Sequence, residues 1–322
     1  MAKAPGRSDR EGLSLVELFR MFPDDDPARN WIEGIVWPNG PHCPHCGSAN
    51  VQPGIKHKSM THRCRECAGK PRFSVKTGTV MQSSKLGYQT WAIAAYLVTT
   101  NLKGVSSMKL HRDLKITQKS AWHLMHRLRK TYELGQPVFA GPVEADETYI
   151  GGVEKNKHAD KKLNAGRGTV GKAIVVGVKD RDSNQVAAKV ISDTKAETLQ
   201  NFVESRTEPE AQVYTDTGSG YVGMDRAHES VNHSAREYVR EMARTNGIES
   251  FWSMLKRAHK GTFHKFSKKH FHRYIGEFSG RHNDRDTDTV DQMDGVVSVM
   301  VGKRLRYSDL IADNGLNSGA RT

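Results

Sequence analysis

Val143-Glu144-Ala145-Asp146-Glu147-Thr148-Tyr149-Ile150 reads as a β-strand, because it is rich in β-branched and aromatic residues and the pair Gly151-Gly152 stops it. Two further apolar runs, Lys172 to Lys179 and Val186 to Ile191, flank the polar stretch Asp182-Ser183-Asn184. Turn-forming residues between two strand-like runs are typical of a β-hairpin. This part of the chain is therefore expected to form a strand followed by a hairpin.

A helix and one more strand follow the hairpin. The helix is expected from Lys195 to about Ser205, and the strand is Gln212-Val213-Tyr214-Thr215-Asp216. The order strand, hairpin, helix, strand favours an α/β domain with a mixed sheet, of the ribonuclease H-like kind. On neighbouring strands of such a sheet, Asp146 and Asp216 are placed to share divalent metal ions.

An amphipathic helix is predicted over Thr245 to Arg257. Its apolar face consists of Ile248, Phe251, Trp252 and Leu255. Its polar face consists of Glu249, Ser253, Lys256 and Lys260. Residues 244–273 contain eight Lys or Arg, and Glu249 is the one acid among them. An acid in such basic surroundings is best explained by a metal ion or an ion pair.

A helical segment from Tyr88 to Tyr132 precedes the α/β part. Trp91, Ala94, Ala95 and Val98 recur at the spacing of one buried helix face. A helix from Ser106 to Leu114, a break at Lys115-Ile116 and a second helix after the N-cap Thr117 match a helix-turn-helix layout. The residues expected to face the major groove of DNA are Gln118, Lys119, Ser120 and His123. A small helical bundle with a basic exterior is the alternative.

All four cysteines of the chain lie in two C-x-x-C pairs. The pairs are Cys43 with Cys46 and Cys64 with Cys67, and 17 residues separate them. This spacing predicts a structural Zn²⁺ site with four thiolate ligands, whose metal supplies the folding free energy of so small a segment. Gly47 and Gly69 follow the pairs and are expected to supply backbone freedom for the turns.

The charge of the chain favours a polyanionic partner. Lys and Arg number 49 against 36 Asp and Glu, which gives a net charge of +13 over 322 residues. Such a surface attracts nucleic acid. The chain contains no apolar run of the length that crosses a membrane and no secretory apolar region. The expected location is therefore the cytoplasm.

These features together resemble a known family. The acids Asp146, Asp216 and Glu249 resemble the triad of DDE transposases from bacterial insertion sequences, and the chain is most similar to the zinc-ribbon, ISXO-like branch. The matching motifs run over roughly residues 13–310. They are Phe22-Pro23-Asp24, Trp37-Pro38-Asn39-Gly40, both C-x-x-C pairs, Gly78-Thr79-Val80, Lys103-Gly104-Val105-Ser106, Ala121-Trp122, Asp146 to Gly152, Val231-Asn232-His233-Ser234, Glu249-Ser250-Phe251-Trp252, Glu277-Phe278, Arg281 and Asn283.

The resemblance implies a transposase that cleaves DNA at element ends and joins the ends to target DNA. It implies that Asp146, Asp216 and Glu249 hold Mg²⁺ or Mn²⁺, while Lys256 binds a nearby phosphate. Asn246 competes with Glu249 for the third position, and Glu249 is preferred because a carboxylate binds a hard cation better than an amide. The implied partners are terminal inverted repeats, target DNA and further copies of this chain on DNA, and the implied location is the bacterial nucleoid.

Five segments are expected. They are an N-terminal helical segment (1–38), the zinc ribbon (39–80), a helix-turn-helix-like DNA-binding segment (81–138), a ribonuclease H-like catalytic domain (139–285) and a C-terminal tail (286–322). Two other functions fit parts of the pattern. One is a domesticated regulator that binds DNA without catalysis, and the other is a nuclease that hydrolyses DNA without joining it.

Overall fold

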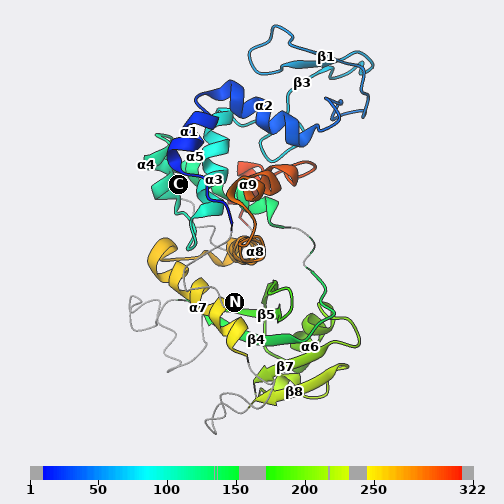
Figure 1. Cartoon of the computed structure of the whole chain (residues 1–322), viewed down its shortest axis with the longest axis vertical. Helices are drawn as coiled ribbons and strands as arrows, with labels where there is room; N and C mark the ends of the chain where they lie inside the picture. Colours follow the sequence, from blue (N-terminus) through cyan, green and yellow to red (C-terminus); the bar gives the residue numbers. More distant parts are fainter. Residues whose placement is uncertain are drawn as a thin grey trace. The chain divides into compact units, whose positions relative to one another are not determined.

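The computed structural model describes residues 10–133, 135, 137–151, 172–216, 218–231 and 245–313. Their contacts divide the chain into two compact units (Figure 1). The first unit contains the N-terminal residues up to 132 together with 284–312, and the second contains mainly residues 133–283. Gly152, the motif residues 232–234 and the chain end 314–322 lie outside the described residues.

The first unit begins with two helices and a small sheet. Helix α1 covers Leu15–Met21 and helix α2 covers Asp25–Val36. Ser14 and Glu17 form a capping box at the start of α1, which satisfies backbone N–H groups there. The ribbon segment contains the strands β1 (Val51–Pro53), β2 (His62–Cys64) and β3 (Arg72–Phe73), which pair antiparallel in that order.

The predicted helices after the ribbon are confirmed. They are α3 (Tyr88–Thr100), α4 (Ser107–Asp113) and α5 (Gln118–Thr131). Thr117 caps α5 as predicted, because its side chain accepts from the Ser120 N–H at 3.2 Å. The turn between α4 and α5 contains Lys115 at φ 50°, and this left-handed residue redirects the chain.

The C-terminal region differs from the tail expected over 286–322. Helix α9 (Thr289–Ser298) and helix α10 (Tyr307–Ile311) lie in it. Val296, Val297 and Met300 belong to the same hydrophobic core as the ribbon and α3. Apolar residues at 293, 296, 297 and 300 have helical spacing, so the sequence carried the signal for α9.

A mixed sheet of five strands forms the centre of the second unit. Its strands are β4 (Val143–Ile150), β5 (Ala173–Asp180), β6 (Val186–Ile191), β7 (Gln212–Asp216) and β8 (Ala227–Val231), in the order β6-β5-β4-β7-β8. β5 pairs antiparallel with β4 and β6, whereas β7 pairs parallel with β4 and β8. The predicted strand, hairpin and following strand are therefore confirmed, and β8 is an additional edge strand.

Helices pack on both faces of this sheet (Figure 1). Helix α6 (Ala196–Glu204) and the short 3₁₀ helix η3 (Ser219–Tyr221) contribute to the core on one face. Helix α7 (Asn246–Ala258) and helix α8 (Phe271–Asn283) contribute to the core on the other face. A π-helical turn, η5 (His259–Phe263), and a 3₁₀ turn, η6 (Lys268–His270), connect α7 with α8. None of the helices in the described ranges has the length and apolar character to cross a membrane.

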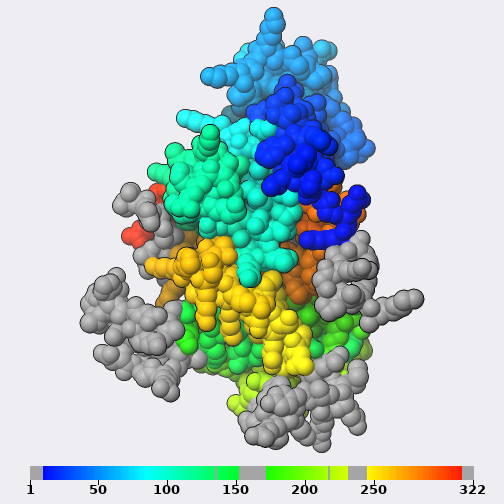
Figure 2. Space-filling view, turned by 60° about the vertical axis from the view of Figure 1, so that its left-hand side comes forward, coloured from blue at the N-terminus to red at the C-terminus, as the bar shows by residue number. Residues whose placement is uncertain are grey.

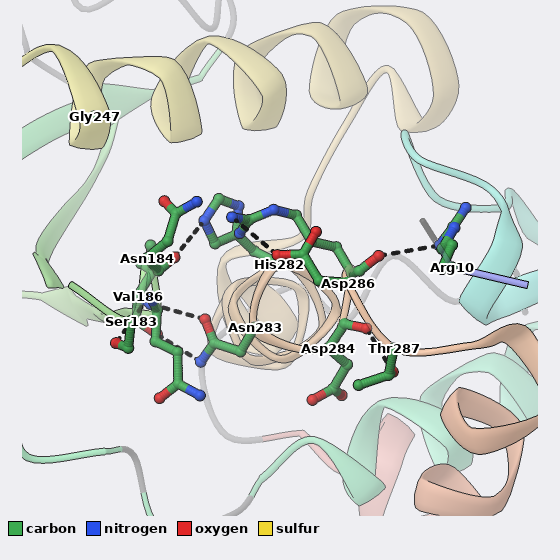
Figure 3. A network of polar contacts seen from close by, with 12 residues as sticks. Arg10, Ser183, Asn184, Val186, Gly247, His282, Asn283, Asp284, Asp286 and Thr287 are labelled. Carbon is green, nitrogen blue, oxygen red and sulfur yellow. Dashed lines mark hydrogen bonds and ion pairs between the residues drawn. The ribbon is translucent and has the colours of Figure 1, made fainter. Parts of the chain in front are cut away.

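The end of α8 is fastened to the edge strand β6 through Asn283 (Figure 3). The Val186 N–H donates to Asn283 Oδ1 at 2.7 Å, and Asn283 Nδ2 donates to the Val186 carbonyl at 3.0 Å. Nε2 of the adjacent His282 lies 3.1 Å from the Asn184 carbonyl. The Asn283 amide thus pairs with an edge residue as a further strand would, which covers backbone groups that an edge otherwise leaves open.

Candidate functional site

Asp146 and Asp216 lie on adjacent strands and on the same face of the sheet. Glu144 of β4 stands opposite Tyr214 of β7. Arg181 donates from Nε to Glu144 Oε1 at 3.1 Å, and its guanidinium lies 4.0 Å from the Tyr214 ring centre. Glu144 and Tyr214 therefore share a face. Because side chains alternate along a strand, Asp146 and Asp216, each two residues further on, share that face as well.

Helix α7 packs over this face and contacts Asp146 directly. Trp252 is buried, and its Nε1 donates to Asp146 Oδ2 at 3.0 Å. Gly177 stands opposite Asp146 on β5, where a Cβ atom would lie 2.7 Å from Cη2 of Trp252. A side chain at this position would push the indole away, so glycine permits the close approach of α7 to the sheet.

Glu249 lies in the first turn of the same helix, three residues before Trp252. Thr245 Oγ1 donates to Glu249 Oε1 at 3.2 Å. The predicted faces of α7 are correct, because all four apolar residues are buried and the four polar ones are exposed. Figure 2 shows α7 (yellow) as a band of outer surface. Lys260 lies beyond α7, in the π-helical turn η5, and Asn246 is the exposed first residue of α7.

The acids on the sheet are electrostatically coupled. Burial, together with the negative charges of Glu147 and Asp216, raises the pKa of Asp146 to about 7. Asp146 and Asp216 share a face and Glu147 is the next residue of β4, so their negative charges repel one another, and a divalent ion would favour the ionised form. Within the described ranges, however, the four cysteines are the one group whose potential ligand atoms lie within 4.8 Å of one another. Carboxylates such as those of Asp146 and Asp216 fit a hard cation in chemistry. The ligand atoms of Asp146, Asp216 and Glu249, all described residues, do not form such a group.

The side chain of Glu147 lies on the opposite face of β4. Tyr221 is buried, and its hydroxyl donates to Glu147 Oε2 at 2.7 Å. Burial raises the pKa of Glu147, while the Tyr221 hydrogen bond opposes the rise. The pKa of Tyr221 is raised by its own burial and by the charge of Glu147. This pair fixes η3, the element that follows β7, to the central strand.

A residue that the sequence analysis did not single out holds α7 in place. Glu144 is 3% exposed, and its Oε2 accepts from the backbone N–H of Ile248 at 2.9 Å. Its other oxygen accepts from Arg181, whose side chain is 11% exposed. A carboxylate at a helix N-terminus is stabilised by the backbone N–H groups there. Glu144 lies two residues before Asp146 on the same face, so strand alternation could have identified it.

Replacing Glu144 with glutamine is expected to loosen α7. The change removes the negative charge from the largely buried pair of Glu144 with Arg181, and breaking a buried pair costs about 3–5 kcal/mol. Hydrogen–deuterium exchange of peptides covering residues 245–258 should show a loss of protection of that order. Glu229→Gln, at an exposed position of β8, is the matched control and should change protection by less than about 0.5 kcal/mol. Equal protection in the Glu144 variant and the control would show that the pair does not hold the helix.

The four cysteines form the predicted metal site. Cys43, Cys46, Cys64 and Cys67 bring their sulfur atoms within 4.8 Å of one another, and Cys46 Sγ lies 3.7 Å from Cys64 Sγ. Gly47 has a φ of 78° and donates its N–H to the Cys43 carbonyl at 2.8 Å, which closes the first turn. Gly69 has no positive φ, so the expectation for this glycine was wrong. Four clustered thiols fit a tetrahedral Zn²⁺ ion.

The residues expected to read DNA from α5 are engaged within the first unit. Gln118 Nε2 donates to Ser107 Oγ at 3.1 Å, and Lys119 Nζ lies 4.6 Å from the Tyr307 ring centre. His123 Nε2 lies 3.1 Å from the Leu305 carbonyl. The start of α5 is therefore partly occupied by the C-terminal segment, which was expected to be a tail.

Two family models and one curated relative match the chain. Residues 23–70 match a transposase zinc-ribbon domain, and residues 138–283 match the ISXO2-like transposase domain. An uncharacterized transposase-like protein of Haemophilus influenzae is 30% identical over 105 residues, which cover 32% of this chain and 84% of that protein.

A solved structure also aligns with part of the chain. It is the cryoEM structure of a simian T-cell lymphotropic virus intasome in complex with PP2A regulatory subunit B56 gamma. The identity is 13%, the TM-score is 0.28, and the alignment covers 59% of this chain and 65% of that one. A likeness this low assigns no fold.

Proposed function

The chain belongs to the ISXO2-like transposase family, and we propose that it cleaves DNA at the ends of a mobile element and joins those ends to target DNA. The observation that carries the proposal is the position of Asp146 and Asp216 on one face of adjacent strands, beneath the helix that bears Glu249. The strand order and directions support a ribonuclease H-like fold for this unit.

Each acid has a proposed role in the site. Asp146, Asp216 and Glu249 would hold Mg²⁺ or Mn²⁺, and when bound the ions supply Lewis acidity and an activated water for phosphodiester cleavage. Glu249 is preferred over Asn246 as the third ligand because hard cations bind carboxylates better than amides. Trp252 keeps one oxygen of Asp146 oriented, and the Glu144 contact holds Glu249 over the sheet.

The exposed face of α7 is the proposed path of the scissile strand. Ser253 and Lys256 continue from Glu249 along this face, and Lys256 provides a positive charge two turns away. We assign Lys256 to a phosphate next to the cleaved bond and Lys260 to one further along. DNA ends and target DNA are the proposed partners, and because two ends must be joined together, the active form is an oligomer on DNA.

Labelled element ends test the proposal directly. Purified protein is incubated with end duplexes, target plasmid and Mg²⁺, and the products are separated on denaturing gels. Products in which the end is joined to the plasmid are expected. Nicked ends without joining would instead identify a hydrolytic nuclease, and binding without any cleavage would identify a regulator.

Metal affinity is expected to depend on pH through Asp146. Its pKa of about 7 lies above the ordinary aspartate value of 3.8, so a proton competes with the ion below about pH 7. Mn²⁺ affinity should fall by up to about tenfold per pH unit below 7 and level off above it. Without metal, the raised pKa of Asp146 means that the folded chain binds one more proton than the unfolded chain between about pH 4 and 7. The free energy of unfolding therefore falls as the pH rises through that range.

Calorimetry in buffers of different ionisation enthalpy measures this competition. At pH 6 the binding of Mn²⁺ should release about one proton, and at pH 8 the release should approach zero. Glu229→Gln should behave as the unaltered chain does. Proton release that is independent of pH would mean that Asp146 is not a ligand.

A further inference from the structure

Two adjoining cavities lie in the first unit, and Gln82 and Arg304 line both. The first, of about 530 Å³, is bounded by residues 42–47, which contain the first C-x-x-C pair, by residues 77–79 and by residues 301–304. The second, of about 390 Å³, is bounded by residues 82–86, by residues 120–127 of α5 and by residues 304–307. Because they share these two residues, we refer to both cavities together as the groove along residues 301–307.

The ionisable groups that line this groove are cationic or imidazole side chains, apart from the zinc-site Cys43 and Tyr307. They are His42, His45, Lys85, His123, Arg127, Lys303, Arg304 and Arg306. Neither lining includes an aspartate or a glutamate. A concave surface with one sign of charge concentrates counter-ions of the opposite sign.

Arg304 and Arg306 are held toward this groove by the residue between them. Leu305 is 4% exposed and anchors the segment, while both arginines are exposed. For the ranges that the structure describes, no ion pair is formed by either guanidinium. The nearby acid Asp309 accepts from the backbone N–H of Arg306 at 3.3 Å.

Arg127 lies behind these two residues and is 8% exposed. Its Nε donates to the Leu305 carbonyl at 3.3 Å, and its Nη2 donates to the Gln82 carbonyl at 3.1 Å. Burial and the charge of Arg304 lower its pKa. Two neighbouring arginines, one of them buried, give the groove a positive charge that favours an anion with several oxygen atoms.

We propose that the groove lined by Arg127, Arg304 and Arg306 binds the phosphate backbone of duplex DNA. The inference rests on the proposed function, since it names the surface through which a transposase would hold its DNA. The C-terminal segment would supply phosphate contacts beside α5. Lys119 and His123, which already touch that segment, would position it and leave the binding of phosphates to the arginines.

The test measures binding of labelled duplexes by fluorescence anisotropy across a range of salt concentrations. Arg304→Gln/Arg306→Gln should bind an element end and an unrelated duplex at least about tenfold more weakly. The slope of log affinity against log salt should fall by about 0.9 for each phosphate that the variant no longer neutralises. Arg304→Lys/Arg306→Lys should restore most of the affinity, because it restores the positive charge. The recovery should be incomplete, because lysine does not make the same hydrogen bonds as arginine.

Arg20→Gln/Arg29→Gln is the matched control, since it removes two arginines of the same unit that line neither cavity. It should leave affinity and slope nearly unchanged. The proposal is overturned if the Arg304 and Arg306 variant keeps its salt slope, or if the lysine variant binds as poorly as the glutamine variant. Binding without cleavage by the unaltered chain would reject the transposase activity alone, whereas cleavage with a slope unaffected by these substitutions would reject the groove alone.

Discussion

Asp216→Asn is expected to lower strand cleavage and joining by more than about a hundredfold. Loss of a residue that only orients a metal ligand already costs about 10–100-fold, so loss of a proposed ligand should exceed that range. Binding of the end duplex should change little, because Lys256, Lys260 and the arginines of the groove, which are the proposed phosphate contacts, are unaltered in this variant. Cleavage on denaturing gels and anisotropy of the same labelled duplex measure the two effects separately.

The same variant should not be less stable without metal. The charge of Asp216 is one of the causes that raise the pKa of Asp146, so its removal relieves repulsion in the sheet. Thermal unfolding without divalent ions should therefore occur at an equal or higher temperature. The rise in melting temperature that Mn²⁺ gives the unaltered chain should disappear, since the ion has one ligand fewer.

Asp225→Asn supplies the matched control, because Asp225 is an exposed aspartate of the same unit. It should cleave, bind and respond to Mn²⁺ as the unaltered chain does. If Asp216→Asn retained cleavage within about tenfold of the control, Asp216 would not be a metal ligand. If duplex binding disappeared as well, the defect would lie in DNA recognition.

The strands of the second unit could be predicted because their signals are local. The residues of β4 and β7 are strand-formers bounded by turn residues, and both strands have the predicted limits. The position of Asp146 and Asp216 on neighbouring strands followed from the order of the elements, although the parallel β4–β7 pair joins segments about 70 residues apart. The two faces of α7 followed from helical spacing alone.

Other features depend on which segments meet, and a local pattern does not specify that. Glu144 caps α7 from a strand 104 residues away, and this contact exists only in the folded chain. His123 faces Leu305 because the segment after α9 returns to α5. From the helical layout alone, this histidine was expected to face DNA. No local sequence pattern near residue 123 predicts that the segment containing Leu305 packs against it.

Cys64→Ser is expected to abolish zinc binding and unfold the ribbon. Structural Zn²⁺ in such small segments contributes about 10–16 kcal/mol at neutral pH, far more than three short strands provide. Cys64 is 1% exposed and pairs through its N–H with the Pro71 carbonyl at 2.7 Å, so it joins the metal site to the small sheet. Zinc content should fall from about one ion per chain to none, and residues 43–73 should lose hydrogen-exchange protection.

The loss of hydrogen-exchange protection should extend through the first unit but not into the second. Cys43 and Cys64 belong to the same hydrophobic core as Trp91 of α3 and Leu124 of α5, whereas the sheet of the second unit has cores of its own. Protection should therefore fall in α3 and α5 by less than in the ribbon and should persist in β4 and β5. His45→Ala is the control, because His45 is exposed within the ribbon and is expected to be no ligand. Zinc retained by Cys64→Ser, or absent from His45→Ala, would require a ligand set other than the four thiolates.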